Sequence, residues 1–327
     1  MKFSVKQAIL ILAGVAVATG CHLIDEDMSD CGAPVELNYT LRQSGDVHTQ
    51  LQTELEKQVP AAAIAALQEY MDAVFAPVAQ EADLGFYKGD APDHRVHKDN
   101  INATTFSYTT EFEDGSYLNL ALANIAGNGI AQLSTGEQPQ ASILTLPEGE
   151  TVDVQKTGLF SARKQFTIEN SEAQTIPVDL YMVNSAVLLV ADTTGSGVTD
   201  LKMFTRDMAS SFNICDSTYH FGSEAKVRAE SIPLTTGWMA LATVNFPSRD
   251  EAVSSGNAVW EVSCYAKCAD GTLTETVLGF KDPLPAGTLK IILAKVLPDG
   301  TIVPDDSAVG VSVTLDWYTG YTGEIDL

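Results

Sequence analysis

The chain is crossed by short runs in which apolar and polar residues alternate, and this pattern limits the fold more than any other feature. The runs VELNYTL (35–41) and VGVSVTLDW (309–317) show it most clearly. Because successive side chains of a β-strand point to opposite faces, such a run predicts a strand with one buried face. In FEDGSY, the dipeptide Asp114-Gly115 predicts a hairpin between two such strands. Similar runs recur between turn residues, so we predict a mainly β protein built from β-sandwiches.

One segment breaks the β pattern. In PAAAIAALQEYMDAVFAPV, which begins at Pro60, apolar residues recur every three or four positions, which predicts an amphipathic helix that faces a sheet. The length of the chain exceeds that of one typical domain, so we expect two sandwiches. The polar stretch NSEAQT (170–175) indicates the boundary between them. We therefore expect an N-terminal sandwich over 35–170, with inserted helices at about 49–82, and a C-terminal sandwich over 171–327.

The N-terminus predicts an exported, lipid-anchored protein. Lys2 and Lys6 open the chain, an apolar run from Ala8 to Val17 follows, and small residues lead to Cys21. This is the layout of a secretory signal, and the apolar run is too short for a comfortable membrane span. The small residues directly before Cys21 resemble the bacterial lipobox, in which diacylglycerol is attached to the cysteine thiol. We expect residues 1–20 to be removed and Cys21 to carry a covalent lipid; an ordinary signal with a chance cysteine is the alternative.

Acidic residues follow this cysteine closely. Residues 21–34 contain a run of them that is similar to the tether directing some Bacteroidetes lipoproteins to the cell surface; a plain solvated linker is the alternative. We therefore expect the chain in the outer membrane, at the cell surface. Without residues 1–20 the chain has 17 basic residues against 43 acidic ones. A field of this sign repels phosphates, so we predict no nucleic-acid partner.

Four further cysteines are candidates for disulfide bonds: Cys31, Cys215, Cys264 and Cys268. An even number of cysteines in an exported protein suggests disulfides, although four cysteines allow three pairings and the sequence does not choose among them. The spacing of Cys264 and Cys268 is C-x₃-C, but no pair of histidines or cysteines stands close by as a zinc partner. We predict no metal site and no cofactor apart from the covalent lipid.

Three further motifs suggest chemistry, and for each we prefer a structural interpretation. Residues 192–196 look like the D-T-G-S signature of aspartic proteases, but an extra threonine displaces the carboxylate and no second such motif is present, so we predict a turn. His94 and His97 are interpreted as two solvated histidines of a loop. We therefore predict that the chain is not an enzyme. The tryptophans stand in strand-like runs, where core packing is more common than a sugar-binding platform: Trp238, Trp260 and Trp317.

Several short segments share a pattern with one family. DEDMSDC runs from just beyond Cys21 into the strand VELNYTL, FAPVAQEADLGFYKGD follows the helix, LFSARKQFTI precedes the boundary and VTLDW lies near the end. These segments resemble the FimB-type fimbrial anchor lipoproteins of Bacteroidales. The resemblance implies two transthyretin-like β-sandwich domains and a role in holding the base of a fimbria in the outer membrane. The helical insertion that we expect in the first domain, at 49–82, departs from the simplest members of the family.

The resemblance also implies a fimbrial stalk subunit as partner, joined by donation of a strand to a neighbour's open sheet. Cutting between Cys21 and the first strand would release this chain from its membrane, so we expect residues 309–327 to form the exchanged strand. The alternative is that this segment is the last strand of its own sandwich. For the whole protein, the alternative function is a surface lipoprotein that binds a glycan or a host protein. The candidate side chains of the partner-binding strand are Val309, Val311, Val313, Leu315 and Trp317.

Overall fold

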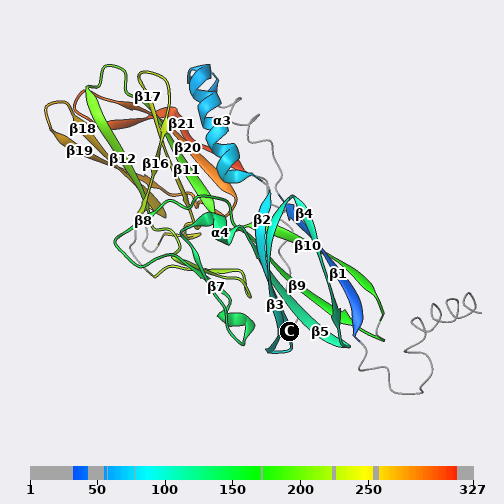
Figure 1. Cartoon of the computed structure of the whole chain (residues 1–327). Coiled ribbons are helices and arrows are strands. Elements are labelled where there is room, and N and C mark those ends of the chain that lie inside the picture. Colours follow the sequence, from blue (N-terminus) through cyan, green and yellow to red (C-terminus); the bar gives the residue numbers. More distant parts are fainter. Residues whose placement is uncertain are drawn as a thin grey trace, which may run out of the picture.

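The computed structural model describes residues 32–42, 55, 56, 58–76, 78–170, 172–222, 226–252 and 258–314, with side chains described up to Asp305. The described chain is mainly β and forms several sheets, as predicted (Figure 1). None of the helices in this part of the chain is both long and apolar enough to cross a bilayer.

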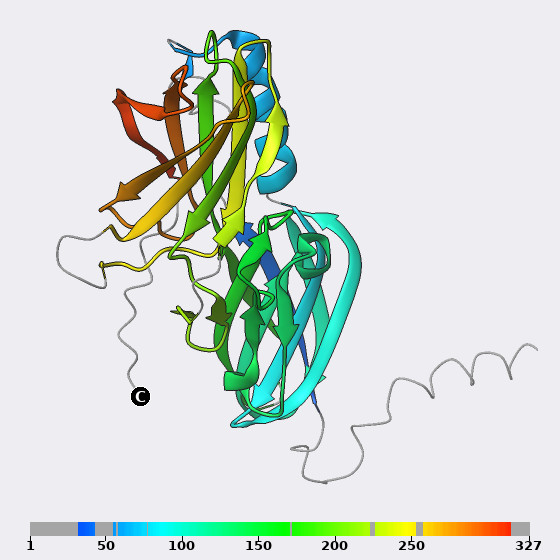
Figure 2. The same ribbon diagram turned by 90° about the vertical axis from the view of Figure 1, so that its left-hand side faces the viewer.

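A seven-stranded sheet forms the first part of the molecule, in the order β3-β2-β5-β9-β10-β1-β4. Its edge strands, β3 and β4, follow each other in the chain with only Thr104 between them, so the sheet curls until its two edges meet there (Figures 1 and 2). The alternating apolar residues of β1 are fully buried inside it, as predicted. The strands are β1 (Ala33–Arg42), β2 (Ala79–Lys88), β3 (Ala91–Ala103), β4 (Thr105–Phe112), β5 (Gly115–Ala123), β9 (Phe160–Ile168) and β10 (Gln174–Met182).

Two five-stranded sheets form the second part and share one buried core. The first has the order β16-β17-β11-β20-β21 and the second β19-β18-β12-β15-β8. Val187 and Leu189 of one sheet pack in the same cluster as Met203 and Val262 of the other. The strands are β8 (Thr151–Asp153), β11 (Ser185–Asp192), β12 (Val198–Arg206), β15 (Lys226–Arg228), β16 (Glu230–Pro233), β17 (Trp238–Asn245), β18 (Trp260–Cys268), β19 (Leu273–Phe280), β20 (Thr288–Val296) and β21 (Ile302–Thr314).

Segments from both halves of the chain pair across the junction of these parts. β8, from the first half, pairs with β15, from the second. A small sheet likewise joins β6 (Gln132–Ser134) and β7 (Ile143–Thr145) to β13 (Ser211–Asn213) and β14 (Thr218–His220). A helical turn, α4 (Ile125–Asn128), and a 3-10 turn at Pro139–Ala141 lie between these strands in the sequence.

Buried amide side chains tie this junction together. Asn184, fully buried between β10 and β11, accepts a hydrogen bond from the Leu159 N–H at 3.1 Å and donates to Gln155 Oε1 at 3.1 Å. Asn128 donates to the same Gln155 oxygen at 3.1 Å, and the Gln155 backbone N–H reaches Val244 of β17 at 3.1 Å. Because each buried amide must keep its partners, the network favours one arrangement of the two parts.

The helix α3 (Ala61–Phe75) forms where the apolar spacing predicts it, but it covers a different sheet from the one expected. We predicted it as part of the first sandwich. Its buried residues Ile64, Leu67 and Met71 instead share a cluster with Leu188 and Val190 of β11, so the helix lies along the outer face of the β16-β17-β11-β20-β21 sheet (Figures 1 and 2). The reason is that β11 is apolar on both faces, and its outer face needs a cover.

Two turn signals are real, but the pairing around them differs from the prediction. The boundary expected at 170–175 is a turn within the first part, because β10 pairs in parallel with β1 and completes the first sheet. The chain passes to the second part at residues 183–184 instead. The predicted hairpin at Asp114-Gly115 is also wrong: β4 pairs with β1, whereas β5 pairs with β2 and β9. The Asp114 carboxylate accepts the Asn170 N–H at 2.9 Å, so this turn is held by the opposite loop and not by a ladder of its own strands.

Candidate functional site: two open sheet edges

The last described strand, β21, lies at an edge of its sheet and has β20 as its only described neighbour. Pro304 stands opposite Ala294, and Val309 stands opposite Ile292, so residues 305–308 form a bulge against a single residue of β20. The ladder is therefore divided. Residues 309–314 pair with β20 through a short ladder of their own, which has a second register shift at Gly310, and their other edge is open in the described structure.

Three of the five predicted partner-binding residues lie on this short ladder: Val309, Val311 and Val313. Leu315 and Trp317 lie outside the described residues. In the described structure the segment pairs as the edge strand of its own sandwich, the arrangement that the alternative interpretation predicts. Exchange of the strand with another subunit stays a prediction.

A second open edge interrupts the seven-stranded sheet between β9 and β10. Each of these strands has nine residues, yet they pair only at Phe160 with Met182 and at Ser161 with Tyr181. Elsewhere β9 pairs only with β5 and β10 only with β1. We call this opening the β9–β10 seam. Along it, the facing backbone edges have no strand partner among the described residues.

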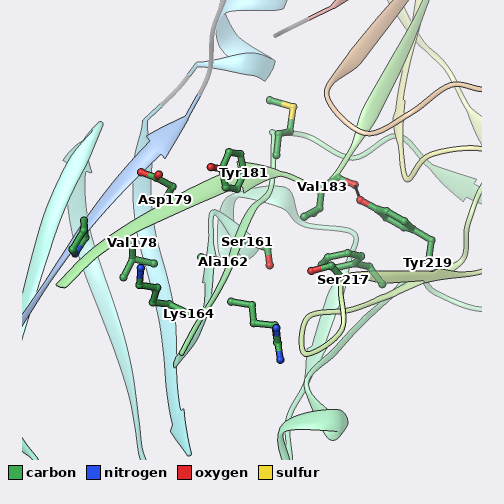
Figure 3. Close-up of a pocket in the computed structure, with 13 residues that line it drawn as sticks. Ser161, Ala162, Lys164, Val178, Asp179, Tyr181, Val183, Ser217 and Tyr219 are labelled. Atoms are coloured by element: carbon green, nitrogen blue, oxygen red, sulfur yellow. Dashed lines mark hydrogen bonds between the residues drawn. The ribbon is translucent and has the colours of Figure 1, made fainter. Parts of the chain in front are cut away.

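A groove of about 450 Å³ follows the β9–β10 seam (Figure 3). Residues 161–164 of β9 form one wall, and residues 177–179, 181 and 182 of β10 form the other. Phe212 and Tyr219, from the β13–β14 hairpin, contribute to one end. The Tyr219 hydroxyl donates to the Val183 carbonyl at 2.8 Å, and burial raises the pKa of Tyr219, so it acts as a neutral donor. The volume lies within the range of small-ligand sites, about 300–1,000 Å³.

Charge and a proline protect the seam from unselective pairing. Lys164 stands on one wall, and Asp179 on the other accepts a hydrogen bond from Arg42 Nε at 2.8 Å. Pro177 has no N–H to donate, a feature that open-edged strands tolerate. Such devices are typical of sheet edges that must not aggregate. At its far end the seam is crossed by one side chain, since Gln174 Nε2 donates to the Thr167 carbonyl at 3.2 Å.

The groove was not predicted from the sequence, because the boundary expected at 170–175 places its two walls, β9 and β10, in different sandwiches. One signal was present in the chain. Pro177 lies inside the strand run IPVDLYM, and a proline in such a run indicates an open edge. The residues that line the groove otherwise show no motif, because only the pairing of distant strands brings them together.

The described cysteines do not form the predicted disulfides. Cys215, Cys264 and Cys268 are buried free thiols. Cys264 and Cys268 share β18, and at about 3.3 Å per residue they stand roughly 13 Å apart, beyond the ~7 Å limit for a disulfide. Cys215 belongs to a different buried cluster. Burial raises the pKa of the Cys264 thiol to about 12, which makes it unreactive. Cys31 and the predicted lipid-bearing Cys21 lie outside the described residues.

The turn predicted at residues 192–196 and the core position predicted for Trp260 are both present in the structure. Asp192 Oδ1 accepts the Thr194 N–H at 2.9 Å, which forms a turn at the end of β11. Trp260 is 1% exposed and stacks on Phe280 with ring centroids 4.1 Å apart, so it is a core residue. Trp238 is half-buried, and Trp317 lies outside the described residues.

The two histidines lie on β3, so the loop predicted for them is wrong. Pro92, two residues before His94, lies in the same strand, and β3 is an edge strand, where proline is tolerated. His94 stacks on Phe86 of β2 with ring centroids 4.5 Å apart. His97 instead lies beside the carboxylates of Asp83 and Asp99.

By sequence, no protein-family profile and no curated protein matches the chain. By structure, it is similar to a candidate adhesin from Bacteroides thetaiotaomicron, with a TM-score of 0.52 at 11% identity, over 89% of this chain and 100% of that one. It is also similar to a candidate polysaccharide-binding protein from the same species, with a TM-score of 0.51 at 9% identity, over 84% and 96% of the two chains. The fimbrial anchor protein Mfa2 from Porphyromonas gingivalis matches with a TM-score of 0.49 at 12% identity, over 83% and 95%. At these identities the likeness is one of fold.

Proposed function

We propose that this chain is a lipid-anchored outer-membrane protein that holds the base of a fimbria by β-strand exchange with the first stalk subunit. The observation that carries the proposal is the β9–β10 seam, an opening inside an otherwise continuous sheet. The fold likeness to candidate adhesins is consistent with a fimbrial or adhesin-like role at the cell surface. The lipobox-like start of the sequence supplies the membrane attachment.

The chemistry of the seam suits an extended polypeptide. An incoming strand would find backbone N–H and C=O groups along β9 and β10, which supply affinity without regard to sequence. Its alternate side chains would meet Ala162 and Val178 on the walls, which supply selectivity. Because the walls belong to strands fixed by β5 and β1, the groove is formed before the partner arrives.

The C-terminal segment offers the complementary route, in which this chain donates the strand. The lipid occupies the N-terminal end, so the C-terminal end is the one free to enter a neighbour. The bulge at 305–308 separates residues 309–314 from the rest of β21, so their release breaks only one short ladder. We therefore keep a second direction of exchange, in which this chain donates its terminal strand. The side chains that would fill the partner's pockets are those of Val309, Val311, Val313, Leu315 and Trp317.

We expect that blocking the correct edge releases stalk subunits into the medium. Lys164→Trp places a large side chain in the groove from a half-buried position, and Gln165→Trp, its exposed neighbour outside the groove, is the matched control. Deletion of residues 316–327 tests the donated strand. The measurement is the cell-bound fraction of stalk protein, with a thermal melt to verify that each variant is folded.

The outcomes separate the two directions. Loss of the stalk with Lys164→Trp but not with Gln165→Trp or the deletion shows that the seam receives a strand. Loss with the deletion alone shows that this chain donates one. Full stalk retention in both the Lys164→Trp variant and the deletion variant overturns the proposed function.

The groove also favours a second candidate function, the binding of a surface polysaccharide. Tyr181, Phe212 and Tyr219 line the groove together with Lys164 and Asp179, a mixture of apolar and polar groups typical of ligand pockets. Purified chain that binds soluble polysaccharide, and loses this binding with Tyr181→Ala while the stalk stays attached, would favour this function over the anchor.

A further inference from the structure

Four polar side chains gather on one face of the β2–β3 pair, and the proposed function does not use them. Glu81 and Asp83 are two residues apart on β2, and His97 and Asp99 are two residues apart on β3. In the antiparallel ladder Glu81 stands opposite Asp99 and Asp83 opposite His97. Residues at this spacing share a face of the sheet, so the four side chains form a compact square.

The spacing within this square suits a metal ion. One donor atom from each of Glu81, Asp83 and His97 lies within 4.8 Å of the other two. His97 Nδ1 is 3.4 Å from Asp83 Oδ1. In a tetrahedral site with bonds of about 2.0–2.1 Å, donor atoms stand roughly 3.4 Å apart, so this pair already has the required separation.

Asp99 orients the imidazole toward the centre of the square. Its Oδ1 lies 2.7 Å from His97 Nε2. A carboxylate on one ring nitrogen fixes the tautomer and leaves the other nitrogen free as a ligand, the arrangement found around most metal-bound histidines. The lone pair on Nδ1 then lies beside Asp83 Oδ1, at 3.4 Å.

Glu81 contributes a buried carboxylate that has one unpartnered oxygen. It is only 5% exposed, and its Oε1 accepts the Ala126 N–H at 2.8 Å. Its Oε2 is buried and has no hydrogen-bond partner in the described part of the chain. A buried carboxylate oxygen without a partner costs free energy. Burial raises the pKa of Glu81, and the nearby charge of Asp83 raises it further.

We propose that Glu81, Asp83 and His97 bind one divalent transition-metal ion, with zinc preferred, and that Asp99 positions the histidine. Imidazole together with carboxylates suits zinc, and three protein ligands leave a position for water. The ion has access from solvent, since the side chains of His97 and Asp83 are 44% and 24% exposed. Bound there, it ties the edge strand β3 to β2. This inference does not rest on the fimbrial role.

Zinc titration of the mature full-length chain, stripped with a chelator, tests the proposal. We expect calorimetry to show one equivalent bound in the parent protein and at least tenfold weaker binding in His97→Gln and in Asp83→Asn. Asp99→Asn should weaken binding by about 10–100-fold. His220→Gln removes an exposed histidine of β14, which belongs to a different sheet from β2 and β3, and should bind like the parent. Zinc should raise the thermal midpoint of the parent and not that of His97→Gln.

Two results would overturn the proposal. Equal zinc uptake by the parent and by His97→Gln would assign the ion to other groups in the chain. No uptake by the parent would leave a protonated His97 as the partner of the carboxylates. Cobalt in place of zinc distinguishes this site from binding at a cysteine. Nitrogen and oxygen donors give visible absorption, whereas a thiolate ligand adds a charge-transfer band in the near ultraviolet.

Discussion

Cys21→Ser is expected to move the whole protein out of the membrane fraction. The predicted anchor depends on acyl chains attached at this one thiol, and serine cannot carry the thioether. Each buried CH₂ contributes about 0.8 kcal/mol, so one acyl chain binds weakly and several bind durably. The strongly acidic chain has no compensating attraction to anionic lipid. Cell fractionation and labelling with a fatty-acid analogue measure the change.

Cys31→Ser is the matched control, because it removes a nearby cysteine from the same acidic stretch and leaves the lipobox-like residues intact. We expect this variant to stay in the membrane and to take up the label. A Cys21→Ser protein that still fractionates with the outer membrane would contradict the lipid anchor. The protein would then need another means of attachment to the membrane.

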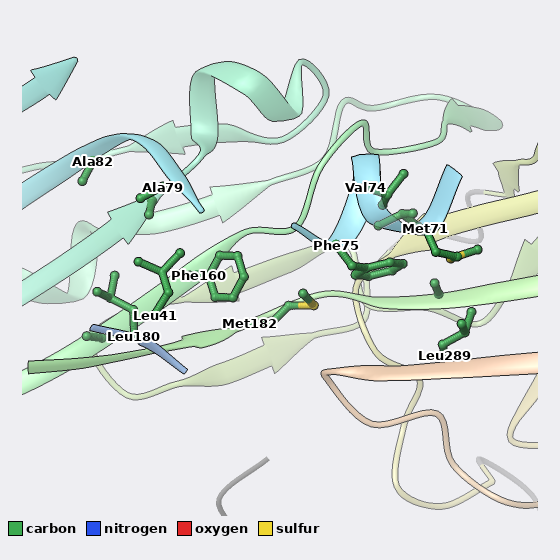
Figure 4. Close-up of a cluster of buried hydrophobic side chains, with 14 of the residues drawn as sticks. Leu41, Met71, Val74, Phe75, Ala79, Ala82, Phe160, Leu180, Met182 and Leu289 are labelled. Atoms are coloured by element: carbon green, nitrogen blue, oxygen red, sulfur yellow. The ribbon is translucent and has the colours of Figure 1, made fainter. Parts of the chain in front are cut away.

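Phe75→Ala is expected to lower the free energy of unfolding by about 3–5 kcal/mol. Phe75 is 2% exposed at the end of α3 and shares a buried cluster with Met182 of β10 and Leu289 of β20 (Figure 4). Removal of the ring leaves a cavity between the helix and both parts of the molecule. Urea unfolding measures the change, and a second transition would show that the two parts had become uncoupled.

Tyr70→Phe on the same helix is the matched control. Its hydroxyl makes a long hydrogen bond of 3.4 Å to Glu230 Oε2, and the loss of one such bond should cost no more than about 1 kcal/mol. If Phe75→Ala costs as little as Tyr70→Phe, α3 does not hold the two parts together.

Local sequence patterns predicted individual strands and the helix, but they did not predict which strands pair with each other. The alternation in VELNYTL determined the buried face of β1, and the apolar spacing around Leu67 determined α3, because both depend only on neighbouring residues. The partner of β10 lies about 140 residues earlier in the chain, and nothing near NSEAQT encodes that distance. The sequence did indicate that both faces of β11 are covered, because the run SAVLLVAD has no polar face. The helix α3 covers one of these faces.

The candidate site follows the same rule. A strand at Val309, Val311 and Val313 could be predicted, because apolar and polar residues alternate there within one run. The β9–β10 seam and the square around His97 could not, because each is assembled by the register of separate strands. Asp83 and His97 become neighbours only when β2 and β3 pair in one particular alignment.

The position of β1 has a mechanical consequence. This strand is the first described after the predicted tether, and it runs between two neighbours, with eight paired positions to β10 and eight to β4. A pull transmitted through its N-terminal end acts along the strand axis, so it loads both ladders in shear. Hydrogen bonds loaded in shear must fail together, whereas bonds that unzip fail one at a time. The fold thus presents its most resistant geometry to tension arriving from the membrane.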